Sequence, residues 1–154
     1  MVQEVRYPYT LTWLPDYRPP RHAEVRQVYG LCLTPQNQLV LVSKDSKHWT
    51  LPGGKPEAGE SPTATLQREV LEEACAIVTN HTYLGAQRFS DAITGSTYYQ
   101  LRYLAQVKLR AFEPKFEMRY RRCECLGNAR KALWGGSSPI GNALIDLVAI
   151  HAKV

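Results

Sequence analysis

The chain has 154 residues, 44% of them apolar and 21% charged, and a formal net charge of +5 at pH 7. This length and composition predict one globular domain over residues 1–154 and exclude a second full domain. The charge is too small for a polybasic tail, but it favours polyanionic ligands such as nucleotides or RNA.

No segment of the sequence predicts export or membrane insertion. Residues 1–10 mix Glu4 and Arg6 with aromatic residues, and no apolar run approaches the length that crosses a bilayer. We therefore expect a cytoplasmic protein without membrane contact. The four cysteines lack the C-x-x-C spacing of a zinc site, so we expect buried free thiols at Cys32, Cys75, Cys123 and Cys125.

Residues 1–24 are rich in proline and aromatic residues and predict an extended N-terminal arm. Pro8, Pro15, Pro19 and Pro20 disfavour a regular helix there. We expect this arm to pack over the core of its own chain. A homodimer contact and a flap over a ligand are the alternatives.

Strands and helices are predicted over the rest of the chain. Residues Val25–Leu33 and 38–43 are rich in Val, Leu, Tyr and Cys and flank a Pro-Gln-Asn turn, which predicts two strands. A long helix follows, with Ser61 as its N-cap and Pro62 at its first position.

Further strands are predicted at residues 81–89, 96–109 and 119–125, and a second helix at residues 139–152. In the strand over 96–109, the odd-numbered residues from Tyr99 to Leu109 are apolar or aromatic and share one face. The interleaving of strands and helices predicts an α/β fold.

Three carboxylates crowd one arc of the long helix. At about 100° per residue, Glu72 and Glu73 lie within about 60° of Glu69, and an apolar stripe of Leu66, Val70, Ala74 and Ile77 borders them. Arg68 alone cannot neutralise all three. Because hard divalent cations prefer oxygen ligands, the helix predicts a magnesium or manganese site.

The loop before the helix favours a ligand site over a merely solvated acidic face. Leu51-Pro52-Gly53-Gly54 delivers the chain directly to the helix. Glycine has no side chain, so its backbone can approach a ligand closely. The loop and the helix are therefore expected to form two walls of one site.

The residues from Gly54 to Ala76 resemble the Nudix box of the Nudix hydrolase superfamily. That box reads Gly, five residues, Glu, seven residues and Arg-Glu-apolar-x-Glu-Glu-x-Gly-apolar. Gly54, Glu60 and the run Arg68-Glu69-Val70-Leu71-Glu72-Glu73 match it. Cys75 stands where the box has its last glycine, which leaves open how the helix ends. We expect Ile77 to supply the apolar anchor one position beyond Ala76.

The resemblance implies a Nudix-type α/β/α sandwich with a mixed β-sheet. It also implies a hydrolase that uses Mg²⁺ or Mn²⁺ and water to cleave the diphosphate linkage of a nucleoside diphosphate derivative. The chain lacks the downstream proline or tyrosine that marks ADP-ribose and diadenosine polyphosphate hydrolases. A nucleoside triphosphate or a small nucleotide conjugate is therefore the expected substrate.

Carried over position by position, the resemblance also implies site residues. The metal ligands would be Glu69, Glu72, Glu73 and the carbonyl of Gly53. Arg68 would orient a carboxylate, Gly54 would contact the substrate, and Glu60 would lie near the metals and substrate or support the helix. The general base is Glu69 or a carboxylate from a later loop, where Glu117 ranks above Glu113.

Other flat or basic side chains are candidates for contacting the base and phosphates of a substrate. They are Trp49, Arg88 and Tyr99, with Phe89, Arg102 and Trp134 as further choices. Core packing is the alternative for Tyr99, and anchoring of a turn is the alternative for Trp134.

Two other functions are compatible with the sequence. One is a non-catalytic Nudix-fold module that binds a nucleotide or RNA, although the intact carboxylates of the box favour an enzyme. The other is an RNA 5′-end pyrophosphohydrolase that uses the basic region as a backbone track. That region comprises Arg119, Arg121, Arg122, Arg130 and Lys131.

Overall fold

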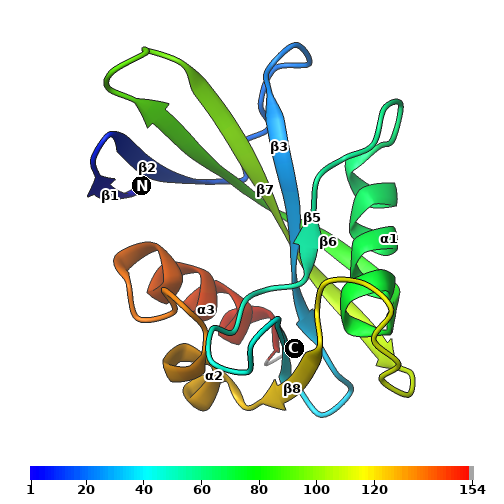
Figure 1. Cartoon of the computed structure of the whole chain (residues 1–154). Coiled ribbons are helices and arrows are strands. Elements are labelled where there is room, and N and C mark those ends of the chain that lie inside the picture. The colour runs from blue at the N-terminus through cyan, green and yellow to red at the C-terminus, as the bar shows by residue number, and fades with distance from the viewer. Residues whose placement is uncertain (153–154) are drawn as a thin grey trace.

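Residues 1–152, which the computed structural model describes, form a mixed eight-stranded sheet with helices on both faces (Figure 1). The strands are β1 (Val2–Arg6), β2 (Tyr9–Pro15), β3 (Val25–Leu33), β4 (Leu39–Ser43), β5 (Gly53–Gly54), β6 (Ala76–Asp91), β7 (Thr97–Leu109) and β8 (Tyr120–Glu124). The helices are α1 (Pro62–Ala74), α2 (Leu126–Ala132) and α3 (Pro139–Ala152).

The strand order is β1-β2-β6-β7-β3-β4-β8, with the short β5 paired to β3. Strands β3 and β7 run parallel, whereas the other paired strands run antiparallel. Helix α1 covers one face, and α2 and α3 cover the other (Figure 1). The predicted α/β/α sandwich with a mixed sheet is confirmed.

Alternation along the central strands divides the core between the two faces. Val28 of β3 packs with Leu66 and Val70 of α1 in one buried cluster. Leu31 of β3 packs with Ile145 of α3 in the cluster on the opposite face. Because side chains of a strand point alternately to the two faces, β3 serves both clusters at once.

Several predicted elements match the structure closely. The strand Val25–Leu33 and the helix Pro139–Ala152 have the predicted bounds. The Ser61 hydroxyl accepts a hydrogen bond from the Ala64 N–H at 3.2 Å, which confirms it as the N-cap of α1. In β7, the odd-numbered residues from Tyr99 to Val107 are buried in the α1-side core, as predicted.

The N-terminal segment is extended, but half of residues 1–24 form strands of the sheet. Strand β2 pairs with β6 along its whole length, and Trp13 is 2% exposed. Its prolines are compatible with this pairing because Pro8 lies in the turn and Pro15 ends the strand. The segment predicted as an arm over residues 1–24 is therefore partly built into the sheet, because β1 and β2 form ladder hydrogen bonds with their neighbours. A homodimer contact through this segment stays a prediction.

The sequence did not predict α2, and it predicted only part of β6. Helix α2 includes Gly127 and Asn128, which are poor helix formers. Strand β6 contains two register shifts, between Val78 and Asn80 and between Tyr83 and Gly85. These irregularities interrupt the alternation of side chains, so the pattern does not show the full strand.

All four cysteines of the described chain are free thiols, but only Cys32 is fully buried. Burial raises the pKa of the Cys32 thiol to about 12. Cys75 and Cys123 are half-buried, and Cys125 is exposed at the start of α2. The expectation of buried thiols was thus wrong for Cys125, which is the N-cap of α2 and lies outside the sheet.

Helix α1 ends in a left-handed residue although the box glycine is absent. Cys75 has φ 50° and ψ 48°, and its N–H bonds to the Leu71 carbonyl at 3.1 Å. The Arg121 guanidinium of β8 donates to the Ala74 carbonyl at 2.8 Å, which places a positive charge at the negative end of the helix. Ala76 itself is fully buried and Ile77 only half-buried, so the expected shift of the apolar anchor was wrong.

None of the three helices within residues 1–152 combines the length and the hydropathy needed to cross a membrane.

Replacing Cys75 by glycine is expected to stabilise the fold. A non-glycine residue in the left-handed region costs about 1–2 kcal/mol, of which glycine's greater unfolded-state freedom offsets about 0.4–1 kcal/mol. We expect the free energy of unfolding to rise by about 0.5–1 kcal/mol in urea titrations. Cys123→Gly is the control, since Cys123 lies inside β8 and its replacement should lower stability. A loss in Cys75→Gly equal to that in the control would contradict this account.

Candidate active site

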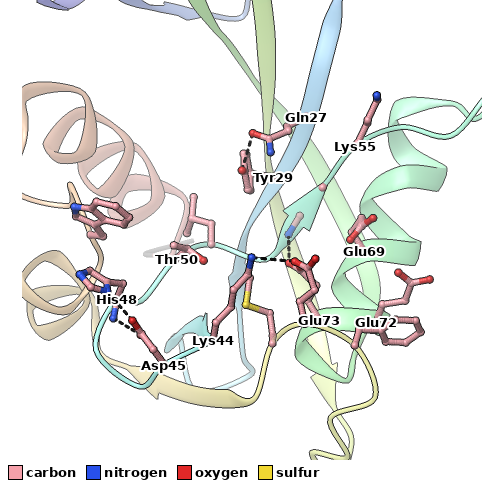
Figure 2. Close-up of a pocket in the computed structure, with 17 residues that line it drawn as sticks. Gln27, Tyr29, Lys44, Asp45, His48, Thr50, Lys55, Glu69, Glu72 and Glu73 are labelled. Carbon is pink, nitrogen blue, oxygen red and sulfur yellow. Dashed lines mark hydrogen bonds and ion pairs between the residues drawn. The ribbon is translucent and has the colours of Figure 1, made fainter. Parts of the chain in front are cut away.

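A cleft of about 770 Å³ opens where α1, β3, β5 and three loops meet. The labelled Glu69, Glu72 and Glu73 extend from α1, and Lys44, Asp45 and His48 come from the loop after β4 (Figure 2). Residues 116–118 and Trp134 complete its lining. The acidic helix and the glycine loop thus form walls of one cleft, as the sequence predicted.

The two glycines of β5 fit between β3 and α1 because they have no side chains. A Cβ atom on Gly53 would lie 2.2 Å from the Val28 carbonyl oxygen, and one on Gly54 would lie 2.5 Å from the Glu69 carboxyl carbon. Real Cβ atoms do not approach other atoms so closely. The Gly53 N–H also donates to Glu73 Oε1 at 3.0 Å, which fixes that carboxylate against the loop.

Arg68 holds the carboxylates of the box in place. Its Nε and Nη2 donate to the two oxygens of Glu60 at 2.8 and 2.9 Å, a bidentate pair. Its Nη1 donates to Glu69 at 2.6 Å and lies 3.4 Å from Glu72. Glu60 does not line the cleft. It bonds instead to Arg68 and Thr65 of α1, which fits the expected alternative that Glu60 supports the helix.

Carboxylates outnumber amines in the cleft. Five carboxylates line it, those of Asp45, Glu69, Glu72, Glu73 and Glu117, against the two ammonium groups of Lys44 and Lys55. Burial raises the pKa of Glu73 to about 7, and the nearby charges of Glu69 and Glu117 act in the same direction. The cleft therefore has a deficit of positive charge around Glu73.

This donor set fits a divalent cation. Glu69, Glu72 and Glu73 offer carboxylate oxygens on one helix face, and hard cations such as Mg²⁺ and Mn²⁺ prefer such ligands. A divalent charge would also offset the repulsion that raises the pKa of Glu73. Within residues 1–152, no three acidic, histidine or cysteine side chains converge tightly enough to enclose an ion as they stand.

Glu117 and Glu113 occupy different places. Glu117 lines the cleft, is 75% exposed and forms an ion pair with Lys44 at 3.0 Å. Residue Arg119 fixes this loop by donating its N–H to the Ser43 carbonyl at 2.9 Å. Glu113 is outside the lining, and its carbonyl lies 3.7 Å from Cys75 Sγ at the end of α1.

Three predicted substrate contacts lie outside the cleft. Tyr99 is buried in the core beneath α1, and Arg88 is paired beside it on β6. Trp49 packs on the opposite core, with the Arg122 guanidinium 5.1 Å from its ring. These placements correct the prediction, because strand alternation turns Arg88 away from the face that bears Gln87 and Phe89.

The sequence also missed residues that do line the cleft. They are Gln27, Tyr29, Lys44, Asp45 and His48. Gln27 is a polar residue in a mostly apolar strand, and it shares a face with Tyr29, which is a weak signal of a site. The loop after β4 gave no signal, because its turn-forming hydrogen bonds to Asp45 also suit an ordinary surface loop.

A family model described as the NUDIX domain matches residues 24–123. The chain belongs to the Nudix hydrolase superfamily. This membership places it among the Nudix pyrophosphohydrolases. No curated protein matches the chain.

Solved structures of Nudix proteins share the fold. The chain is 22% identical to the pyrophosphohydrolase BsRppH of Bacillus subtilis, solved as a mutant, with a TM-score of 0.73 over 99% of this chain and 96% of that chain. The MutT protein of Bacillus halodurans is 20% identical, with a TM-score of 0.62 over 79% and 82% of the two chains.

The Nudix domain of Shewanella oneidensis NrtR, solved with ADP-ribose, is 18% identical, with a TM-score of 0.63 over 90% of this chain and 95% of that chain. At identities this low, these likenesses show the fold alone.

Glu60→Gln is expected to change how the stability of the protein depends on pH in the acidic range. The Arg68 guanidinium, with the Thr65 hydroxyl, lowers the pKa of Glu60 from 4.5 to about 2. A lowered folded-state pKa contributes stability above the unfolded value, and this contribution disappears as the pH falls from about 4.5 to about 2. The Tm difference between wild type and Glu60→Gln should therefore be largest near neutral pH and shrink over this range.

Glu57→Gln is the matched control, because Glu57 is 70% exposed and lies 3.8 Å from Arg68. Its Tm difference from wild type should be small and nearly independent of pH. A Glu60→Gln profile parallel to wild type would contradict the role of the Glu60–Arg68 pair.

Proposed function

We propose that this protein hydrolyses the diphosphate linkage of a nucleoside triphosphate or a small nucleotide conjugate, with Mg²⁺ or Mn²⁺. The observation that carries the proposal is the cleft in which Glu69, Glu72 and Glu73 face the backbone of Gly53–Gly54. Membership of the superfamily supports the reaction class.

The residues divide the binding work between them. Glu69, Glu72, Glu73 and the carbonyl of Gly53 would hold the divalent ion, which supplies charge neutralisation at the phosphates and activation of the attacking water. Arg68 keeps Glu69 in position. Lys44 and Lys55 place ammonium groups in the cleft, where they can pair with phosphate oxygens.

In the reaction, a water oxygen forms a bond to one phosphorus of the linkage. The bond between that phosphorus and the bridging oxygen breaks, and the bridging oxygen leaves on the other phosphate. One proton of the water passes to a base, and the remaining proton is lost from the new phosphate. No redox partner is needed.

Glu117 is the proposed general base. It lines the cleft and is exposed enough to accept a proton from water. Its Oε2 lies 3.0 Å from the Lys44 ammonium group. Glu69 suits this role less well, because its carboxylate already accepts from Arg68 and packs against Gly54.

The contacts of the basic region disfavour an RNA track. The guanidinium groups of Arg121, Arg122 and Arg130 bond within the protein, to the carbonyls at the end of α1, to Glu124 and to Asp146, respectively. These arginines serve the fold and do not form a free cationic strip. A nucleotide substrate is therefore preferred over RNA, and the intact carboxylates favour an enzyme over a non-catalytic module.

Glu72→Gln is expected to lower the turnover of nucleoside triphosphates about 10²–10³-fold, because a metal-binding carboxylate becomes neutral. The fold should survive, since the side chain of Glu72 is 30% exposed. Release of nucleoside monophosphate with magnesium or manganese is the readout, and chelation should abolish it. Glu24→Gln, in an exposed ion pair with Arg26 just before β3 and outside the cleft, is the control. Unchanged turnover in Glu72→Gln would contradict the assignment of Glu72 as a metal ligand.

Glu117→Gln is expected to lower kcat about 10²–10⁴-fold with little change in KM, because it removes proton transfer rather than binding. Glu113→Gln serves as the comparison, because its contacts lie at the end of α1. If Glu113→Gln lost activity while Glu117→Gln kept it, the base assignment would be reversed.

A further inference from the structure

A second cavity of about 600 Å³ adjoins the carboxylate cleft. The two share Tyr29, Thr50, Leu51 and Trp134 as lining residues. The wall from β6 and β7 carries Gln87, Gln100 and Arg102, and the remaining lining is largely apolar, with Leu11, Phe89, Leu133, Ile140 and Leu144 among its members. We call this space the Arg102 cavity.

Arg102 is a buried cation in this wall. It is 7% exposed, and within residues 1–152 no carboxylate forms an ion pair with it. Burial lowers the pKa of Arg102 to about 10, so the guanidinium is still charged at neutral pH. Buried charges are normally paired, so an unpaired one lining a cavity points to an acceptor supplied from outside.

The guanidinium is held mainly through its Nη2, and its Nη1 donates to the Leu101 carbonyl at 3.4 Å. Its Nη2 donates to Gln87 Oε1 at 3.0 Å and to Gln100 Oε1 at 2.8 Å, and it lies 4.8 Å from the centre of the Tyr29 ring. Its Nε is the one buried side-chain nitrogen or oxygen of the described chain that has no hydrogen-bond partner. An unsatisfied buried donor costs about 1–3 kcal/mol.

The same network continues into the carboxylate cleft. Gln100 Nε2 donates to Gln27 Oε1 at 2.6 Å, and the Tyr29 hydroxyl donates to the same oxygen at 2.7 Å. Gln27 and Tyr29 line the carboxylate cleft, whereas Gln100 and Arg102 line the Arg102 cavity. A ligand that spans both spaces would therefore place its phosphates at the carboxylates and its other end at Arg102.

We propose that the Arg102 cavity binds the nucleobase of the substrate and that Arg102 makes the site selective for a 6-oxopurine such as guanine. This inference rests on the proposed function and names its substrate class. Guanine presents two adjacent acceptors, O6 and N7, to an arginine, whereas adenine presents an amino donor beside N7. The guanidinium N–H groups that Gln87 and Gln100 leave free would meet an acceptor in guanine and a second donor in adenine.

A nucleobase fits the Arg102 cavity better than a phosphate group does. A buried phosphate needs several donors, but Nη2 of Arg102 already donates to Gln87 and Gln100 and Nη1 to the Leu101 carbonyl, which leaves few of its N–H groups free. The apolar lining and the ring of Phe89 suit a flat, weakly polar group. Glu4 does not serve as the missing partner, because its oxygens already accept from Arg6 and from the Ile140 N–H.

The test measures kcat/KM for GTP, ITP and ATP with the wild type and with Arg102→Met. In the wild type we expect kcat/KM for GTP and ITP to exceed that for ATP by about tenfold or more. A lost or mismatched hydrogen bond to a nucleobase usually weakens binding by this factor. In Arg102→Met the ratio of kcat/KM for GTP or ITP to that for ATP should fall close to one, because only the values for GTP and ITP decrease. A merely structural role would lower all three values together.

Lys108→Met is the matched control, because Lys108 is an exposed residue of the same strand, outside both cavities. It should keep the wild-type ratio. If Arg102→Met does not fold, Gln87→Leu is used, which removes an acceptor that positions the guanidinium and should also reduce the ratio. Equal kcat/KM for GTP and ATP in the wild type, or an unchanged ratio in a folded Arg102→Met, would overturn the inference.

Equilibrium binding of GMP and AMP separates this inference from the proposed function. If no nucleotide is hydrolysed but the wild type binds GMP more tightly than AMP and Arg102→Met does not, the hydrolase proposal fails and the base selectivity stands. If hydrolysis requires Glu72 but shows no base preference, the hydrolase proposal stands and the base selectivity fails.

Discussion

The close approach of Gly53 and Gly54 to their neighbours is the constraint on which the site depends. On one side the chain touches the backbone of β3, and on the other it touches the carboxyl group of Glu69. Any side chain at either position would separate the loop from β3 or α1. The contacts of these two glycines therefore determine both the packing of α1 on the sheet and the position of the site carboxylates.

The charges of α1 are arranged around that contact. Arg68 is bound by Glu60 on one side and reaches Glu69 and Glu72 on the other, so one guanidinium organises three carboxylates. Glu73 is held instead by the Gly53 N–H, in a more buried place. A divalent cation would offset the repulsion between Glu73 and the neighbouring carboxylates, so the crowding of these groups and the proposed chemistry have a common origin.

The two faces of β3 explain why the core and the cleft lie so close together. Val28 faces the α1 core, whereas Gln27 and Tyr29 face the cleft and connect it to Arg102 through Gln100. A single strand thus anchors the carboxylate helix and also carries the polar network between the cavities. The side chains at the far end of that network belong to β6 and β7, which are distant in sequence from the Nudix box.

The sequence by itself determined what depends on local spacing. The N-cap at Ser61, the carboxylates on one arc of α1 and the alternation of β7 follow from helix and strand periodicity, and the spacing of the box indicated the family. Only the tertiary structure decided what depends on which strands become neighbours. It turned Arg88 and Tyr99 away from the cleft, brought Lys44 and Tyr29 into it, and buried Arg102 without a carboxylate partner. Periodicity gives the face of each side chain relative to its own element, but pairing and packing decide what that face meets.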